Sequence, residues 1–284
     1  MDNQHVSPNK QPKGVNEMKS IFNVVHGSIT LEEAPPLYAQ LNNADFRKTV
    51  APFITKSYIR RIAKMVGVEV DAIRVGDALA WDRFFIHYKG LMMPLHDMRL
   101  STLESMSTVR AFHLQKESID QLLYENDFEL YLGRVDKRLR LYTFSKMYNR
   151  IPAKDLMSCF EYVHTSAEGR YGLISEGVLY NVHMRLSKRP EYRRRMQELE
   201  PSLNEDGTLT IYRGCQGNQL DDADERTRSW TTDKAVAEFF AERFSGDNEY
   251  PGHVKQLVVK PSEVLFYLTG RGEDEVLLKR GGTN

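Results

Sequence analysis

The side chains best suited to chemistry lie after residue 200. Glu273 and Glu275 stand two positions apart at the expected start of a strand. In an extended backbone, residues i and i+2 point to the same face about 7 Å apart, so we expect both carboxylates on one face. Such a pair can exchange protons with a substrate or stabilise a positive charge that develops during a reaction. Considered alone, an E-x-E pair is also typical of a solvated strand edge.

Two further polar groups precede this pair. Arg213 is expected at the end of a strand and is followed by Gly214, whereas the segment Ser229-Trp230-Thr231-Thr232 precedes a predicted helix. A guanidinium is a planar fork that suits phosphates and carboxylates. Considered singly, the arginine is typical of a salt-bridge partner and the hydroxyl segment of a helix cap. Their order and setting together favour a common site.

The order of these segments resembles a known motif set. I-Y-R-G, then R-S-W-T-T-D before an A-E-F-F helix, then R-G-E-D-E-V-L-L resemble the R-S-E class of mono-ADP-ribosyltransferases, as in bacterial toxins and phage-encoded modifiers. The resemblance covers about residues 208–280. It implies a split β-sandwich that binds NAD as a substrate, uses no metal, and transfers ADP-ribose to a macromolecular acceptor.

The resemblance assigns roles only to matching residues. Arg213 matches the arginine that binds the NAD pyrophosphate or a ribose, and Gly214 matches the glycine whose backbone approaches the nicotinamide amide. Ser229 matches the hydroxyl that holds the catalytic carboxylate, and a register with Thr231 in this role fits nearly as well. Glu275 matches the glutamate that stabilises the oxocarbenium-like state.

Other matching residues concern the acceptor and the nicotinamide. Glu273 is expected to orient the acceptor nitrogen and take up its proton, which favours a protein arginine as the acceptor. Arg271 stands where the family has its target-recognition turn. Ser229, Trp230 and Thr231 are expected to line the NAD site, with Trp230 in place of a smaller residue common in the family. Phe239 or Phe240 could offer a ring to the nicotinamide, although core packing explains both phenylalanines equally well.

Composition and charge are those of a globular protein. The 284 residues include 39 Lys plus Arg and 39 Asp plus Glu, which argues against a polyanion binder spanning the whole chain. No stretch approaches the roughly 18 uninterrupted apolar residues of a membrane span, so we expect no membrane partner and a cytoplasmic location, in the host cytoplasm for an effector. Cys159 and Cys215 are too few for a disulfide framework or a multi-cysteine metal site.

Periodicity predicts an α+β protein in three parts. Residues 1–18 are polar and expected to form a flexible tail, residues 19–200 are expected to be a helical region that positions the target, and residues 201–284 are expected to form the catalytic core. Apolar stripes predict helices over 54–66, over 77–90, over 141–148 and over 156–163, and the basic run Arg193-Arg194-Arg195 is expected on the solvated face of another.

The part after residue 200 has the pattern of a sheet with one helix. Short β-rich segments predict strands at 208–212, 254–259, 264–268 and 276–278. Between the first two, the sequence after Asp233 predicts a helix whose apolar stripe is Val236, Phe239, Phe240 and Phe244.

Three alternatives remain open at this point. The acceptor could be water, which would make the protein an NAD glycohydrolase that depends less on Glu273. The C-terminal fold could be an inert scaffold, with a helical part that binds a protein or nucleic acid; residues 1–200 carry 29 basic and 24 acidic side chains, although nothing specific supports a nucleic-acid partner. Finally, Val25-His26-Gly27-Ser28 resembles the opening motif of a different, histidine-using class of ADP-ribosyl enzymes, but it stands about 180 residues before the other motifs.

Overall fold

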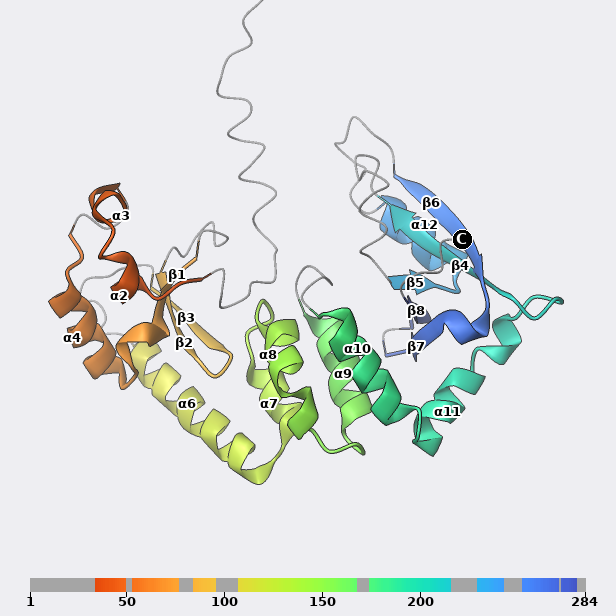
Figure 1. The fold of residues 1–284 in the computed structure, drawn as a ribbon, viewed down its shortest axis with the longest axis horizontal. Coiled ribbons are helices and arrows are strands. Elements are labelled where there is room, and N and C mark those ends of the chain that lie inside the picture. Colours follow the sequence, from red (N-terminus) through yellow and green to blue (C-terminus); the bar gives the residue numbers. More distant parts are fainter. Residues whose placement is uncertain are drawn as a thin grey trace, which may run out of the picture. The chain divides into compact units, whose positions relative to one another are not determined.

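The computed structural model describes residues 34–49, 53–76, 84–95, 107–167, 174–215, 229–242, 252–270 and 272–279. These residues form two compact units (Figure 1). The first holds the described residues up to 87 and between 93 and 109, and the second holds 88–92 and the described residues from 110 onward. The expected tail, residues 1–18, and the His26 motif lie outside the described residues.

Among the described residues, the first unit starts with the helices α2 (Leu37–Gln40), α3 (Ala44–Thr49) and α4 (Lys56–Val66). The predicted helix at 54–66 is confirmed by α4. Its first turn is capped by the hydroxyl of Thr55, which accepts from the Tyr58 N–H at 3.2 Å. It ends at Gly67, whose φ of 71° is the left-handed conformation that a glycine adopts without strain. The buried face of α4 carries Ile59 and Ile62.

The helix predicted over residues 77–90 is wrong where the structure describes it. Residues 84–88 form strand β2 (Phe84–Tyr88) of a three-stranded sheet with the order β1-β2-β3, flanked by β1 (Ile73–Val75) and β3 (Leu91–Pro94). Lys89 and Gly90 have φ values of 44° and 87° and make a tight hairpin turn. The aromatic and β-branched run before the turn suits a pleated strand, and this preference outweighs the helix-like spacing of the aromatics.

The second unit begins with a helical layer (Figure 1). Its helices are α6 (Ser107–Glu125), α7 (Phe128–Arg134), α8 (Arg140–Met147), α9 (Leu156–Ser166), α10 (Glu176–Leu186) and α11 (Pro190–Gln197). The predicted helices at 141–148, at 156–163 and around the basic run are confirmed. Buried Arg140 donates to the carbonyls of Leu132 and Ser166, both at 3.1 Å, and so ties the ends of α7 and α9 together.

A five-stranded antiparallel sheet follows, so the protein is of the α+β class. Its order is β6-β4-β5-β8-β7. Its elements are β4 (Leu209–Cys215), β5 (Ser229–Thr231), β6 (His253–Val259), β7 (Val264–Leu268) and β8 (Glu275–Leu278), with helix α12 (Lys234–Glu242) after β5. The strands predicted after residue 200 are confirmed. One face of the sheet holds a core cluster of Leu199, Leu209, Ile211, Val259, Val264, Tyr267 and Val276.

The helical layer and this sheet share a core. Phe160 of α9 packs against the fully buried Phe266 of β7, with ring centroids 4.5 Å apart. A β-bulge lies between Val264 and Phe266, and the carbonyl of Leu265 accepts a hydrogen bond from Tyr192 of α11. The compact unit therefore extends back to about residue 110, which differs from the boundary at residue 200 expected from the change in composition. Within the described residues, no helix has the length and apolarity needed to cross a membrane.

Candidate functional site

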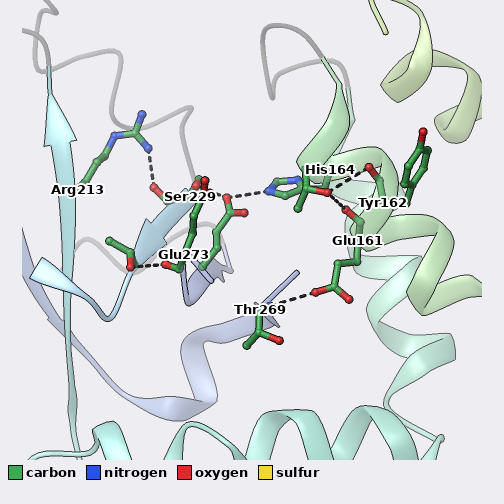
Figure 2. Close-up of polar contacts among 10 residues, drawn as sticks. Glu161, Tyr162, His164, Arg213, Ser229, Thr269 and Glu273 are labelled. Atoms are coloured by element: carbon green, nitrogen blue, oxygen red, sulfur yellow. Dashed lines mark hydrogen bonds and ion pairs between the residues drawn. The ribbon is translucent and has the colours of Figure 1, made fainter. Parts of the chain in front are cut away.

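Neighbouring strands bring Arg213, Ser229 and Glu275 together. The hydroxyl of Ser229 donates to Oε1 of Glu275, and Nη1 of Arg213 donates to the main-chain carbonyl of Ser229 at 2.7 Å (Figure 2). Ser229 thus contacts the carboxylate through its side chain and the guanidinium through its main chain. The three residue types of the sequence motif form one hydrogen-bonded chain across β4, β5 and β8.

The pairing of β5 with β8 explains the contact of the serine with the glutamate. Thr231 lies opposite Glu275, and Ser229 lies opposite Leu277. In an antiparallel pair, opposite residues share a face and diagonal neighbours remain within reach of long side chains, so Glu275 extends toward Ser229. Of the two registers left open by the sequence, the one in which Ser229 holds the carboxylate has this contact. The Thr231 hydroxyl instead donates to the main-chain carbonyl of Glu273 at 2.6 Å.

Arg213 lies at the point where β4 and β5 part. These strands pair through Tyr212 and Thr231, whereas β4 continues its pairing with β6 as far as Cys215. Past that pair, the Arg213 guanidinium supplies a donor to the Ser229 carbonyl. Tyr212 lies opposite Thr231, and Thr231 lies opposite Glu275, so these three residues share one face of the sheet. Arg213 is next to Tyr212 on β4, so its side chain leaves from the other face and reaches the main chain of Ser229.

Glu275 is buried and has a second partner that the sequence did not reveal. Its side chain approaches His164 of α9, with 2.8 Å between Nε2 of the histidine and Oε1 of the carboxylate. The two residues are only 5% and 6% exposed. Both the serine hydroxyl and the histidine ring nitrogen therefore meet the same carboxylate oxygen (Figure 2), which restricts the rotamers available to Glu275 in the folded protein.

The sequence gives only a weak indication that His164 belongs to the site. It follows Phe160 by one helical turn, and the two rings lie 5.7 Å apart on the face of α9 that packs on the sheet. A histidine on such a face is commonly a core residue. The pairing with a glutamate 111 positions later depends on the tertiary packing of α9, so residue spacing alone could not identify it.

The structure does not place Glu273 and Glu275 on one extended strand, contrary to the expectation from their spacing. Strand β8 begins at Glu275, and Gly272 and Asp274 before it have φ values of 67° and 45°. This left-handed turn interrupts the period-two alternation on which the expectation rested. Glu273 is partly buried, and its carbonyl is held by Thr231, while the Asp274 carboxylate accepts from the Tyr267 hydroxyl at 2.9 Å.

Gly214 is explained by helix packing. A Cβ atom added there would lie 2.2 Å from the Ala237 carbonyl oxygen and 2.5 Å from the Ala241 nitrogen of α12. A similar atom at Gly252, just before β6, would lie 1.8 Å from the Ala241 carbonyl oxygen. Helix α12 therefore rests directly on the backbone beside both strands. This contact accounts for the glycine independently of any role beside a nicotinamide.

The aromatic candidates have different surroundings. Trp230 is partly buried and packs against the core cluster, which explains a large residue between two hydroxyls. The predicted apolar stripe of α12 is wrong in part, because the buried residues of this helix are Ala237 and Ala241 and Phe239 is 59% exposed. Phe240 is partly buried. Arg271 and Phe244 lie outside the described residues.

The chain matches no family model. No curated protein and no solved structure matches it either.

The described ranges show no metal-ligand cluster, and the thiol of Cys159 is not activated. Among those residues, no group of three or more His, Cys, Asp or Glu side chains is placed to hold a metal ion. Cys159 and Cys215 are both free and buried. Burial, reinforced by the charge of Glu129, raises the pKa of the Cys159 thiol to about 12, so this cysteine stays protonated near neutral pH.

Proposed function

We propose that the protein is a mono-ADP-ribosyltransferase that cleaves NAD and transfers ADP-ribose to a macromolecular acceptor, a protein arginine being the favoured one. The observation that carries the proposal is the hydrogen bond from the Ser229 hydroxyl to the buried Glu275 carboxylate, with Arg213 bound to the main chain of the same serine. The motif resemblance required these residues to meet, although 62 positions separate Arg213 from Glu275.

The chemistry of the donor set suits NAD. A guanidinium binds phosphate oxygens, and a fixed carboxylate accepts hydrogen bonds from ribose hydroxyls and stabilises positive charge on the ribose. In the proposed reaction the bond between the nicotinamide nitrogen and ribose C1′ breaks, and its electron pair leaves with nicotinamide. Glu275 stabilises the oxocarbenium-like state, as a carboxylate does in glycoside hydrolysis. Its position is fixed before the charge appears, so little reorganisation is needed during the reaction.

The acceptor side of the reaction is assigned to Glu273. A guanidinium is a poor nucleophile while charged, so a carboxylate must orient it and accept a proton as the new nitrogen–C1′ bond forms. The products are ADP-ribosyl arginine, nicotinamide and a proton. The hydroxyl of Thr231 holds the main-chain carbonyl of Glu273, which supports a defined backbone position for this glutamate.

A second candidate, an NAD glycohydrolase, is favoured by one observation. Because Asp274 adopts a left-handed conformation, Glu273 does not continue the strand that presents Glu275. If Glu273 does not reach the acceptor, water attacks C1′ and free ADP-ribose forms. Both reactions release nicotinamide and depend on Glu275, and they differ in whether ADP-ribose becomes attached to a protein.

The decisive experiment uses the full chain with NAD labelled in the adenylate part, with and without a cell lysate. We expect wild-type protein to release nicotinamide and to label a lysate protein on arginine, identified by mass spectrometry. Glu275→Gln should lower nicotinamide release on the order of 10²- to 10³-fold. Glu273→Gln should abolish protein labelling and retain nicotinamide release.

The outcomes separate the three readings. Nicotinamide release without any labelled protein favours the glycohydrolase. Neither release nor labelling by a folded wild-type protein would leave the non-enzymatic binding module as the better reading. Equal release by wild type and Glu275→Gln contradicts the assignment of the catalytic carboxylate. Glu129→Gln, an exposed change on α7, is the matched control for removal of a carboxylate.

A further inference from the structure

One face of α9 contacts both ends of the segment that carries Glu273. His164 meets Oε1 of Glu275 at 2.8 Å, where β8 begins. Glu161, one helical turn earlier, accepts through Oε1 from the main-chain N–H of Thr269 at 3.1 Å, just after β7 ends (Figure 2). Residues three apart on a helix lie on the same side. The helix therefore contacts the first residue after β7 and the first residue of β8.

Several groups fix the contact with Thr269. Arg195 of α11 lies 3.6 Å from Oε1 of Glu161 and donates to the Thr269 hydroxyl. A Cβ atom added at Gly270 would lie only 3.1 Å from the same carboxylate oxygen, so the main chain passes close to Glu161. The Glu161 side chain is 17% exposed. A partly desolvated carboxylate beside an arginine makes a stronger hydrogen bond to an N–H group than a solvated one does.

We infer that α9 is a positioning element of the site, with His164 fixing Glu275 and Glu161 fixing the start of the segment that presents Glu273. This inference rests on the proposed function and assigns the helical layer a specific role in it. A carboxylate held by donors from two directions keeps its rotamer as charge develops beside it. Neither residue of α9 is assigned contact with substrate.

The two contacts have separable consequences. Loss of the His164 contact frees Glu275, which acts in NAD cleavage, so it should lower nicotinamide release and protein labelling together. Loss of the Glu161 contact loosens the start of the segment before Glu273, so it should lower labelling more than release. A merely structural role for α9 would lower both activities in proportion to the fraction of unfolded protein.

For His164 the test compares two substitutions at one position. His164→Leu removes the ring nitrogen and should lower kcat for nicotinamide release on the order of 10²-fold, with a smaller change in KM, since misplacement of a reacting group by about 1 Å has that size of effect. His164→Gln keeps a side-chain N–H near the same place and should recover most of the rate. His113→Leu on α6 is the matched control. Equal rates for His164→Leu and wild type, or equal losses for the leucine and glutamine variants, would overturn the role of His164.

For Glu161 the test needs no enzymatic readout. Glu161→Ala should speed hydrogen exchange of the Thr269 amide at least tenfold, while the amides that pair β4 with β6 keep their protection. Glu161→Gln retains an acceptor oxygen and should exchange like wild type. In activity assays Glu161→Ala should lower the ratio of protein labelling to nicotinamide release. Unchanged exchange and an unchanged ratio contradict the inference, and Glu129→Ala serves as the control.

The two hypotheses fail in distinguishable ways. If wild-type protein releases no nicotinamide, the proposed function fails and the role of α9 in it fails with it, even where the exchange experiment shows that Glu161 holds Thr269. If wild type is active and both α9 variants match it, the proposed function stands and the inference about α9 is wrong.

Discussion

Ser229 contacts Glu275 through its side chain and Arg213 through its main chain. A substitution of the side chain can therefore test the contact with Glu275 alone. Ser229→Ala removes the donor to Glu275 and leaves the carbonyl that binds Arg213 in place. We expect kcat for nicotinamide release to fall on the order of 10²-fold, because the carboxylate loses one of two restraints. Steady-state kinetics over a range of NAD concentrations checks this.

A matched change at the other hydroxyl completes the test. Thr231→Val removes the donor to the Glu273 carbonyl and keeps the β-branched shape that suits a strand. It should lower protein labelling more than nicotinamide release. If Thr231→Val lowers release as much as Ser229→Ala does, the structure has assigned the wrong hydroxyl to Glu275.

The residues of the site differ in how far the sequence could predict them. Arg213 and Glu275 were predictable because each stands at one end of a predicted strand, and the order of Arg213, Ser229 and Glu275 follows a known motif. Strand β5 itself was not predicted, because the hydroxyl segment that begins at Ser229 is also typical of a helix cap. The left-handed turn before β8 was not predictable, because nothing in the letters E-D-E requires a positive φ at Asp274. His164 was not predictable either, because its partner is set by how α9 packs on the sheet.

At the scale of elements, the contact of α12 with the sheet depends on small residues on both sides. Gly214→Ala places a methyl group 2.2 Å from the Ala237 carbonyl oxygen, and backbone cannot yield as a flexible side chain can. We expect α12 to be displaced and the free energy of unfolding to fall by about 1–3 kcal/mol. Urea unfolding followed by circular dichroism measures this.

A second glycine supplies the control for that substitution. Gly177 lies in the first turn of α10, and an added Cβ there meets nothing within 4 Å. Gly177→Ala should leave the protein as stable as wild type or more stable by up to about 1 kcal/mol, because alanine favours the helix. Equal stability of Gly214→Ala and Gly177→Ala would mean that α12 does not need the close contact.

Most elements follow from local pattern, and the exceptions have physical causes. The stripe ending at Gly67 predicts α4 because periodicity and a left-handed stop agree. Spacing of Phe84, Phe85 and Tyr88 also fits a helix, but the following Lys89-Gly90 turn and pairing with β1 and β3 produce a strand. For α12 the sequence predicted the helix but not its buried face. Two glycines of the sheet pack against alanines of the helix, so the alanines and not the phenylalanines are buried.

At the scale of the whole molecule, the change in composition does not coincide with a boundary between the two compact units. The change from helical to β-rich sequence near residue 200 marks a change of secondary structure inside one compact unit. Phe160, Tyr192 and Phe266 form a continuous aromatic contact across that point, with Phe266 touching both of the others. Arg195 belongs to a basic run expected to be solvated, yet it is partly buried against Glu161. Helices and sheet are thus expected to fold together, and α9 can contribute to the site for this reason.

Acid stability of the protein is expected to reflect two partly buried histidines, His87 and His183. Burial, and next the nearby positive charge of Arg74, lower the pKa of His87 to about 4. The two residues share a sheet face, because Arg74 pairs with Phe85, two positions before His87. A histidine with a lowered folded-state pKa is neutral in the folded protein and protonates more readily when unfolded. The free energy of unfolding should therefore fall as the pH drops from about 6.5 to about 4.

The size of the His87 contribution to the free energy of unfolding can be estimated, and a single substitution tests it. At about 1.4 kcal/mol per pH unit, the His87 contribution over this range is at most about 3 kcal/mol. His87→Gln should show a shallower loss of stability in chemical unfolding at pH 7, 5.5 and 4.5. Some loss of stability should remain in the variant, because burial also lowers the pKa of His183 in the second unit.

Asp136 should not contribute to the loss of stability in this pH range. Burial raises the pKa of Asp136, but the hydrogen bonds and charge of Arg138 hold that pKa below its usual value. The stability that Asp136 contributes is therefore lost only in stronger acid. An equally steep fall in His87→Gln and wild type would show that His87 is not kept neutral by its surroundings.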